Sequence, residues 1–134
     1  MRMIVSSCHA DVGAYSMLFD AMRLQVANLT EVGLLFGNSL PVWHGYFPNA
    51  TIWGLDIAPS QRALTTAQRL GSRVKIMPPA NSQDPATLSR LGLTKGSMDI
   101  VIDDGDHRPA GMMRTLVALC KCGSDDLPLA RSEA

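Results

Sequence analysis

The chain has 134 residues, of which 46% are hydrophobic and 18% are charged, a composition typical of one globular domain. Twelve lysine and arginine residues balance twelve aspartate and glutamate residues, so the formal net charge is zero. This balance gives no electrostatic reason to expect nucleic acid or an anionic membrane as a partner. No apolar stretch approaches the roughly 20 residues of a membrane helix. The odd cysteine set of Cys8, Cys120 and Cys122 favours a reducing, cytoplasmic compartment.

Short apolar runs alternate with longer amphipathic stretches along the chain. Residues Tyr15 to Leu24 predict an amphipathic helix. The strands predicted after it are Val26 to Val32, Thr51 to Ile57, Arg73 to Met77 and Met98 to Asp103. The last of these contains the uninterrupted apolar run Ile100 to Ile102, as expected of a strand that is buried on both faces.

A helix signal follows each predicted strand. Proline occupies the expected first helical turn, where its missing N–H has no intrahelical partner, at Pro41, Pro59, Pro85 and Pro109. Side chains suited to N-capping precede three of these prolines: Ser39, Asp84 and Asp106. The second and third of these helices are predicted to end at Gly71 and Gly92.

Repeated strand–helix pairs predict right-handed crossovers, and therefore an α/β fold with a parallel sheet of about four strands and helices on both faces. Ligands of such sheets bind beyond the carboxyl ends of the strands. The domain prediction places an N-terminal segment and helix in residues 1–25, the sheet domain in 26–122 and a polar tail in 123–134.

The first predicted strand runs into a glycine-containing loop in the stretch TEVGLLFGNSLP. Gly33 and Gly37 allow a tight turn whose backbone approaches a ligand, although a purely structural turn explains them equally well. Their spacing differs from the dinucleotide pattern G-x-G-x-x-G, which the chain lacks. The carboxylate of Glu31 suits a cationic group such as an amine and would repel a pyrophosphate.

Asp56 ends the second predicted strand, where a carboxylate is placed to accept hydrogen bonds from both hydroxyls of a ribose. The alternative is an aspartate that caps the following helix. After the third strand, Asn81 and Ser82 are candidates to face an adenine edge, whereas Asp84 is predicted to cap a helix. Together these features predict a ligand that is a nucleoside with an amino-acid tail and no phosphates.

The fourth predicted strand surfaces in the stretch MDIVIDDGDHRPAG, which places three aspartates and a histidine around Gly105. Acidic residues and glycine are common in turns, and an isolated histidine beside a helix start is more often structural than catalytic. Because these residues leave the carboxyl end of a parallel strand, they are predicted to lie on the functional rim of the sheet.

The stretches EVGLLFGNSL, YFPNATIWGLDI and DIVIDDGDH resemble the class I S-adenosylmethionine-dependent methyltransferases. They are most similar to the macrolide (sugar) O-methyltransferase group, whose relatives include proteins named cephalosporin hydroxylases. The resemblance covers about Glu31 to Leu119 and implies a Rossmann-like fold. The third stretch is the most specific, because the family typically shows I-D-D-G-S-H there.

The resemblance implies roles for single residues. Asp104 matches the family's Mg²⁺ ligand, and His107 matches its proposed general base. Asp106 replaces the family's serine and is assigned only a helix cap. Together with the patterns above, the resemblance predicts these S-adenosylmethionine-binding residues: Glu31, Gly33, Gly37, Ser39, Asp56, Ser82 and Asp103.

The function implied is Mg²⁺-assisted methyl transfer to a hydroxyl of a small-molecule acceptor, such as a sugar or another natural product. Mg²⁺ prefers carboxylate oxygens and lowers the pKa of a bound hydroxyl, and His107 would then remove the proton near neutral pH. Two alternatives remain. One is a non-catalytic fragment that binds the cofactor or a partner chain. The other is an NAD-linked oxidoreductase, which Glu31 and the absent dinucleotide pattern disfavour.

No fifth apolar strand follows Leu119 and Cys120, where the resemblance implies a strand whose acidic end completes the metal site. The sequence therefore predicts a truncated domain with impaired activity, without the C-terminal strands of the full class I fold. It also predicts that the fourth strand, Met98 to Asp103, is an open hydrophobic edge through which copies of the chain associate.

Overall fold

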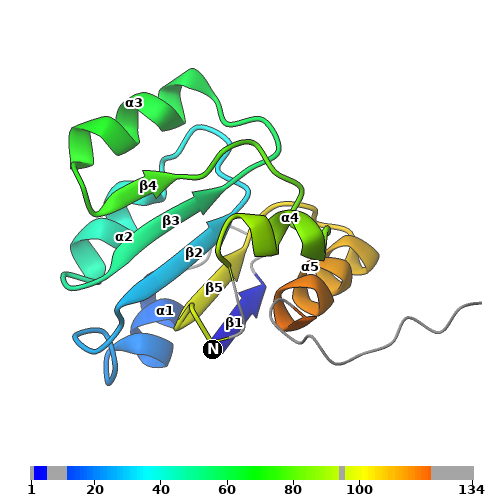
Figure 1. Cartoon of the computed structure of the whole chain (residues 1–134). Coiled ribbons are helices and arrows are strands. Elements are labelled where there is room, and N and C mark those ends of the chain that lie inside the picture. The colour runs from blue at the N-terminus through cyan, green and yellow to red at the C-terminus, as the bar shows by residue number, and fades with distance from the viewer. Residues whose placement is uncertain (1, 6–11, 94–95, 122–134) are drawn as a thin grey trace, which may run out of the picture.

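The computed structural model describes residues 2–5, 12–93 and 96–121, which form a parallel sheet with helices on both faces (Figure 1). The sheet has five strands in the order β1-β5-β2-β3-β4, and each pairing is parallel. The strand bounds are β1 (Arg2–Val5), β2 (Asn28–Val32), β3 (Thr51–Leu55), β4 (Val74–Ile76) and β5 (Ile100–Asp103). The predicted parallel α/β fold is confirmed, and the four predicted strands correspond to β2 to β5.

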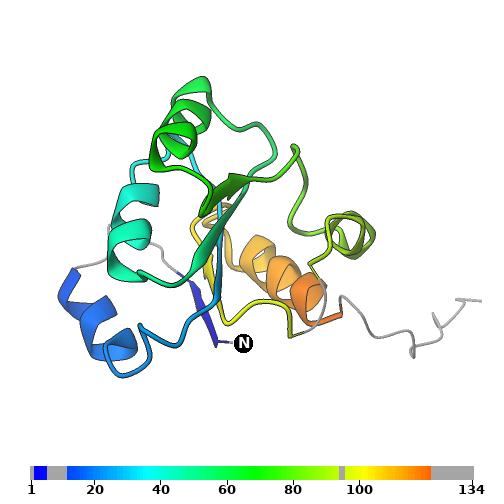
Figure 2. The same cartoon turned by 60° about the vertical axis from the view of Figure 1, so that its left-hand side comes forward.

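The helices divide between the two faces of the sheet (Figure 2). Helices α1 (Val12–Phe19), α2 (Leu40–Tyr46) and α3 (Gln61–Leu70) cover one face, and α4 (Pro85–Arg90) and α5 (Pro109–Lys121) cover the other. Successive strand residues point to opposite faces, so Leu29 packs with residues of α2 and α3, whereas Val32 packs with residues of α4 and α5. Both faces of the central strands are thereby buried.

The starts of the helices largely follow the predicted signals. Proline lies in the first turn of α2, α4 and α5, and Asp84 caps α4 by accepting a hydrogen bond from the Ala86 N–H at 3.1 Å. The start of α3 was predicted wrongly at Pro59. Helix α3 begins two residues later, because the Ser60 hydroxyl accepts a hydrogen bond from the Ala63 N–H at 3.2 Å and caps it.

The helix predicted over Tyr15 to Leu24 lies nearer the N-terminus, as α1, and residues 20–25 form turns. In these turns the Met22 N–H donates to the Phe19 carbonyl at 2.9 Å, so hydrogen bonds of i to i+3 spacing replace those of an α-helix. Phe19 is buried, and its ring packs edge-on against Phe47 with centroids 5.6 Å apart. The end of α1 therefore shares a core with α2.

Strand β1 was missed in the sequence, and it corrects the predicted open edge. Its register with β5 runs from Arg2 opposite Ile100 to Val5 opposite Asp103. Because β5 also pairs with β2, both of its edges are occupied. The prediction that copies of the chain associate through an exposed edge of this strand is therefore wrong. Strand β1 lies within the predicted N-terminal segment 1–25, yet it belongs to the same sheet as the predicted domain of 26–122.

Two further predictions concern composition. No helix in the described ranges is long and apolar enough to cross a membrane. Cys120 is an exposed free thiol in α5, whereas Cys8, Cys122 and the predicted polar tail 123–134 lie outside the described residues.

Candidate functional site

The loops that follow β2 and β5 touch each other through their backbones. A Cβ atom on Gly33 would lie 2.5 Å from the Cα of Gly105 and 2.6 Å from the carbonyl oxygen of Asp104. Gly33 also has a φ of +82°, a conformation that suits glycine. Its N–H donates to the Leu55 carbonyl at 2.9 Å, and the Asp104 N–H donates to the Val32 carbonyl at 2.8 Å. The carboxyl ends of β2, β3 and β5 are thus fixed together.

The rest of the glycine loop rests against the start of α3. Gly37 has a φ of +71°, and a Cβ atom there would lie 2.9 Å from the Cα of Ala63. The Gly37 N–H donates to the Leu34 carbonyl at 2.6 Å, which closes a turn. The hydroxyl of Ser60 donates to the carbonyl of Leu35 at 2.6 Å. Both predicted glycines therefore have a packing role, as the structural alternative required, and they leave the loop backbone at the rim.

Glu31 is a buried acid directly before this loop, with 2% of its surface exposed. Burial raises the pKa of Glu31 from 4.5 to about 7; hydrogen bonds from Ser39 and Trp43 lower it in part, and the nearby Asp104 carboxylate raises it. The Ser39 hydroxyl donates to Glu31 Oε2 at 2.7 Å and therefore does not cap α2, contrary to the predicted cap. The two predicted cofactor-binding residues Glu31 and Ser39 thus contact each other.

Asp56 joins the loop after β3 to the glycine loop. Its Oδ2 accepts a hydrogen bond from the Leu34 N–H at 2.7 Å, and its Oδ1 accepts one from the Ala58 N–H at 2.8 Å. Ser60, rather than Asp56, caps α3, so the helix-cap alternative for Asp56 is wrong. The carboxylate is half-buried. Each carboxylate oxygen has a second acceptor site, which leaves Asp56 able to accept hydrogen bonds from a pair of hydroxyls.

Asp103 lies on the opposite face of the sheet from Glu31, towards α5. Its Oδ1 accepts a hydrogen bond from the Gly105 N–H at 3.1 Å, and its buried Oδ2 has no hydrogen-bond partner among the described residues. Burial raises the pKa of Asp103, while the Gly105 N–H and the Thr115 hydroxyl lower it. The hydroxyls of Ser82 and Thr115 are 3.0 Å apart and share a hydrogen bond. Asp103 and Ser82 therefore lie together beside α5.

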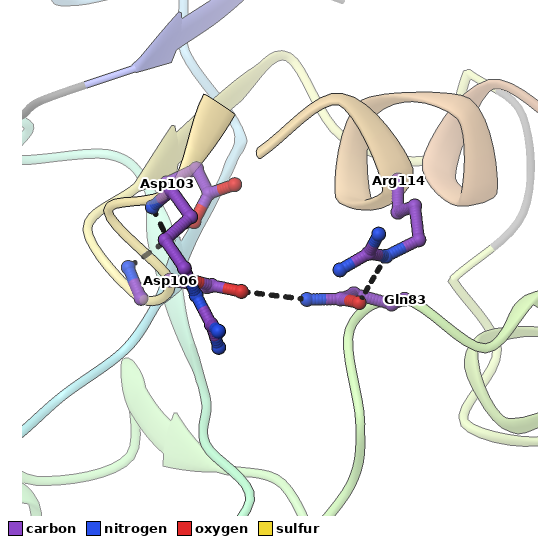
Figure 3. A network of polar contacts seen from close by, with 6 residues as sticks. Gln83, Asp103, Asp106 and Arg114 are labelled. Carbon is purple, nitrogen blue, oxygen red and sulfur yellow. Dashed lines mark hydrogen bonds and ion pairs between the residues drawn. The ribbon is translucent and has the colours of Figure 1, made fainter. Parts of the chain in front are cut away.

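The remaining acidic residues of the β5 loop differ in their exposure. Asp104 and His107 are exposed. Asp106 is bound: its Oδ1 accepts hydrogen bonds from the Arg108 N–H at 3.1 Å and from Arg108 Nε at 3.0 Å, and its Oδ2 accepts one from Gln83 Nε2 at 3.4 Å (Figure 3). Arg108 is the main cause of the lowered pKa of Asp106. Asp106 thus contacts Arg108, which directly precedes α5 (Pro109–Lys121), and Gln83; the helix cap predicted for Asp106 stays a prediction, and the contact with Gln83 was not predicted.

The structure brings most of the predicted site together at one rim of the sheet. Glu31 and Asp104 lie close enough for their charges to interact, Gly33 packs on the Asp104 backbone, and Asp56 binds the loop between them. Ser82 and Asp103 lie on the far side of β5, beside α5. The sequence missed three residues that hold this far side: Gln83, Arg114 and Thr115.

Two surface hollows lie at the margin of this rim, and the second includes Gly37 of the glycine loop. The first hollow, of about 200 Å³, lies between α4 and α5 and is lined by Gln83, Pro85, Met113, Arg114, Val117 and Ala118. The other, of about 310 Å³, lies against α3 and is lined by Gly37, Asn38, Pro41, Arg62, Thr66, Arg69 and Leu70. Neither is lined by Glu31, Asp56 or His107, so the backbone and carboxylate arrangement defines the site better than these hollows do.

No family model matches the chain, but its sequence is similar to those of several characterised enzymes. The chain is 34% identical over 111 residues to L-olivosyl-oleandolide 3-O-methyltransferase of Streptomyces antibioticus, a match that covers 78% of this chain and 27% of that protein. It is 31% identical over 118 residues to 8-demethyl-8-alpha-L-rhamnosyl tetracenomycin-C 2'-O-methyltransferase of Streptomyces olivaceus, covering 83% of this chain and 29% of that one.

A solved structure agrees with these relatives. MycE methyltransferase from the mycinamycin biosynthetic pathway, in complex with Mg, SAH (S-adenosylhomocysteine) and mycinamycin VI, has a TM-score of 0.60 and 30% identity. That match covers 80% of this chain and 27% of MycE. Over the matched residues, the chain is a homologue of class I S-adenosylmethionine-dependent sugar O-methyltransferases. It spans less than a third of the length of these relatives.

The contact at Gly33 gives a prediction about the stability of the chain. Replacing Gly33 with alanine should lower the free energy of unfolding by at least about 2 kcal/mol more than Gly71→Ala, because the added Cβ overlaps the Gly105 backbone. Gly71 is a matched control, with a φ of +83° and no atom within 4 Å of the added Cβ. Urea unfolding measures both losses, and equal losses would contradict the backbone contact.

The buried acid gives a second prediction. Because the pKa of Glu31 is about 7 in the folded chain and 4.5 is the ordinary value, its contribution to stability is present below about pH 4.5 and is lost as the pH rises through about 7. Glu31→Gln should remove this loss. Between pH 5 and pH 8 the variant should gain as much as about 3 kcal/mol relative to the wild type, measured by urea unfolding. A constant difference between the two proteins across this range would contradict the raised pKa.

Proposed function

We propose that the chain binds S-adenosylmethionine and contributes to methyl transfer to a hydroxyl of a small-molecule acceptor that carries a sugar. The observation that carries this proposal is the meeting of Glu31, the glycine loop, Asp56 and the Asp104–His107 loop at the carboxyl ends of β2, β3 and β5. Ligands of open α/β sheets bind at this position, where the strand order reverses. The names of the relatives supply the reaction and the acceptor class.

The residues at the rim suit a nucleoside that carries a cationic tail. Asp56 is half-buried and keeps acceptor capacity for ribose hydroxyls. Glu31 and Asp104 give the glycine loop an acidic neighbour, which attracts an ammonium group and repels a pyrophosphate. This charge pattern supports S-adenosylmethionine over NAD.

S-adenosylmethionine supplies an electrophilic methyl group on a sulfonium sulfur when it is bound. His107 is exposed on the same loop as Asp104 and is therefore open to an acceptor. In the proposed reaction, His107 removes the proton from the acceptor hydroxyl, and the glycine loop and Asp56 hold the cofactor in line with the attacking oxygen.

The described residues do not fit a complete magnesium site. Within those ranges, no group of three His, Cys, Asp or Glu side chains is placed to hold a metal ion. Of the acids in the β5 loop, Asp103 is buried towards α5 and Asp106 is bound by Arg108. Asp104 stays the proposed Mg²⁺ ligand, and we assign no reaction step to the metal. This gap favours the alternative that the chain binds the cofactor but methylates slowly or not at all.

Calorimetric titration with S-adenosylhomocysteine and, separately, with NADH tests the cofactor. The acidic rim predicts saturable binding of S-adenosylhomocysteine, weakened at least tenfold in Asp56→Asn because one hydroxyl acceptor is lost. It predicts no binding of NADH. Binding of NADH alone would contradict the proposal and restore the oxidoreductase alternative.

The role of His107 has its own test. His107→Ala should lower methyl transfer to a panel of glycosides at least a hundredfold, the contribution typical of a general base, and leave the affinity for S-adenosylhomocysteine within twofold. His44→Ala in α2 is the matched control and should change neither quantity. A large loss of affinity in His107→Ala would contradict its role as a base. Absence of turnover in the wild type, with intact cofactor binding, would favour the non-catalytic alternative.

A further inference from the structure

The loop that carries Asp104 and His107 is held from a second side, by the segment that precedes α4. Gln83 Nε2 donates to Asp106 Oδ2 at 3.4 Å, and Arg114 Nε donates to Gln83 Oε1 at 2.7 Å (Figure 3). One residue earlier, the Ser82 hydroxyl bonds to that of Thr115. The segment after β4 is therefore tied both to the loop that precedes α5 and to the second turn of α5.

Arg114 decides which way the Gln83 amide points. A glutamine side chain offers one accepting oxygen and one donating nitrogen. Arg114 can only donate, so it holds the oxygen, and the nitrogen is left to face the Asp106 carboxylate. The opposite orientation would place the amide oxygen against a carboxylate and the amide nitrogen against a guanidinium.

Asp106 connects Gln83 to the loop that carries Asp104 and His107. Its two oxygens have different partners: Oδ1 accepts hydrogen bonds from Arg108, the residue directly before α5, and Oδ2 accepts one from Gln83. Asp106 lies between Asp104 and His107, and on the other side of the loop Gly105 packs against the backbone of Gly33. The loop is thus held between the glycine loop and Gln83.

We propose that Gln83 and Arg114 are positioning residues that act through Asp106, and that this set of three, the latch, fixes the Asp104–His107 loop against the glycine loop for cofactor binding. The proposal rests on the proposed function. The latch predicts that cofactor binding requires a hydrogen-bond donor at one of positions 83 and 106 and an acceptor at the other, whichever residue supplies which.

A reciprocal exchange tests the pair. In Gln83→Glu, two carboxylates face each other. In Asp106→Asn, the amide oxygen stays with the Arg108 N–H, so the new NH₂ group meets the NH₂ of Gln83. The double variant Gln83→Glu/Asp106→Asn restores a donor opposite an acceptor, keeps a partner for Arg114 and has the net charge of the wild type.

Each single variant should weaken S-adenosylhomocysteine binding about threefold to tenfold, the range that corresponds to one hydrogen bond, and the double variant should bind within twofold of the wild type. Backbone NMR order parameters at Gly105 and His107 should fall from about 0.85 to below 0.6 in the single variants and recover in the double variant. Gln68→Glu, on the exposed side of α3, is the control for added charge and should change neither quantity.

Single variants that match the wild type would overturn the latch, and so would a double variant no better than the worse single one. If the wild type does not bind S-adenosylhomocysteine, the proposed function fails. The order parameters of the single and double variants then test by themselves whether the latch holds the loop. Gln83→Ala removes the same hydrogen bonds without adding charge. It replaces either single variant that fails to fold, and an unchanged loop in Gln83→Ala would overturn the proposal.

Discussion

The approach of two backbones at Gly33 is the contact on which the rest of the rim depends. The glycine loop and the β5 loop can lie this close because Gly33 has no side chain and adopts a positive φ. Hydrogen bonds to Leu55 and Val32 then continue the sheet beyond its last strand residues. Because of this contact, the carboxyl ends of β2, β3 and β5 meet at one rim of the sheet instead of ending in three separate turns.

The two buried acids of the rim have different surroundings. Glu31 points to the α2 side and is bound by Ser39, whereas Asp103 points to the α5 side and is bound by the N–H of Gly105. Burial raises the pKa of each. In the loop after β5, the side chains of Asp104 and His107 are exposed, which separates the two buried acids that build the rim from the residues proposed to meet an acceptor.

The sequence predicted those parts of the fold that local patterns encode. Apolar runs located β2 to β5, and prolines located the starts of α2, α4 and α5, because burial and capping depend on neighbouring residues. It did not predict β1, whose four residues are too short a pattern and whose partner β5 lies at the other end of the sheet domain. The same limit applies to the site. The glycine loop and Asp56 follow strand ends, whereas Gln83 meets Asp106 and Arg114 only through the folding of distant segments.

The pairing of β1 with β5 also has a consequence for how the chain folds. Strand β1 precedes every other described element in the chain, but its hydrogen-bonding partner is the last strand of the described sheet. It cannot pair with β5 until the chain has been synthesised through Asp103, and closing so long a loop is entropically costly. Non-local pairing of this kind slows folding, so the docking of β1 is expected to be the last step in assembling the sheet.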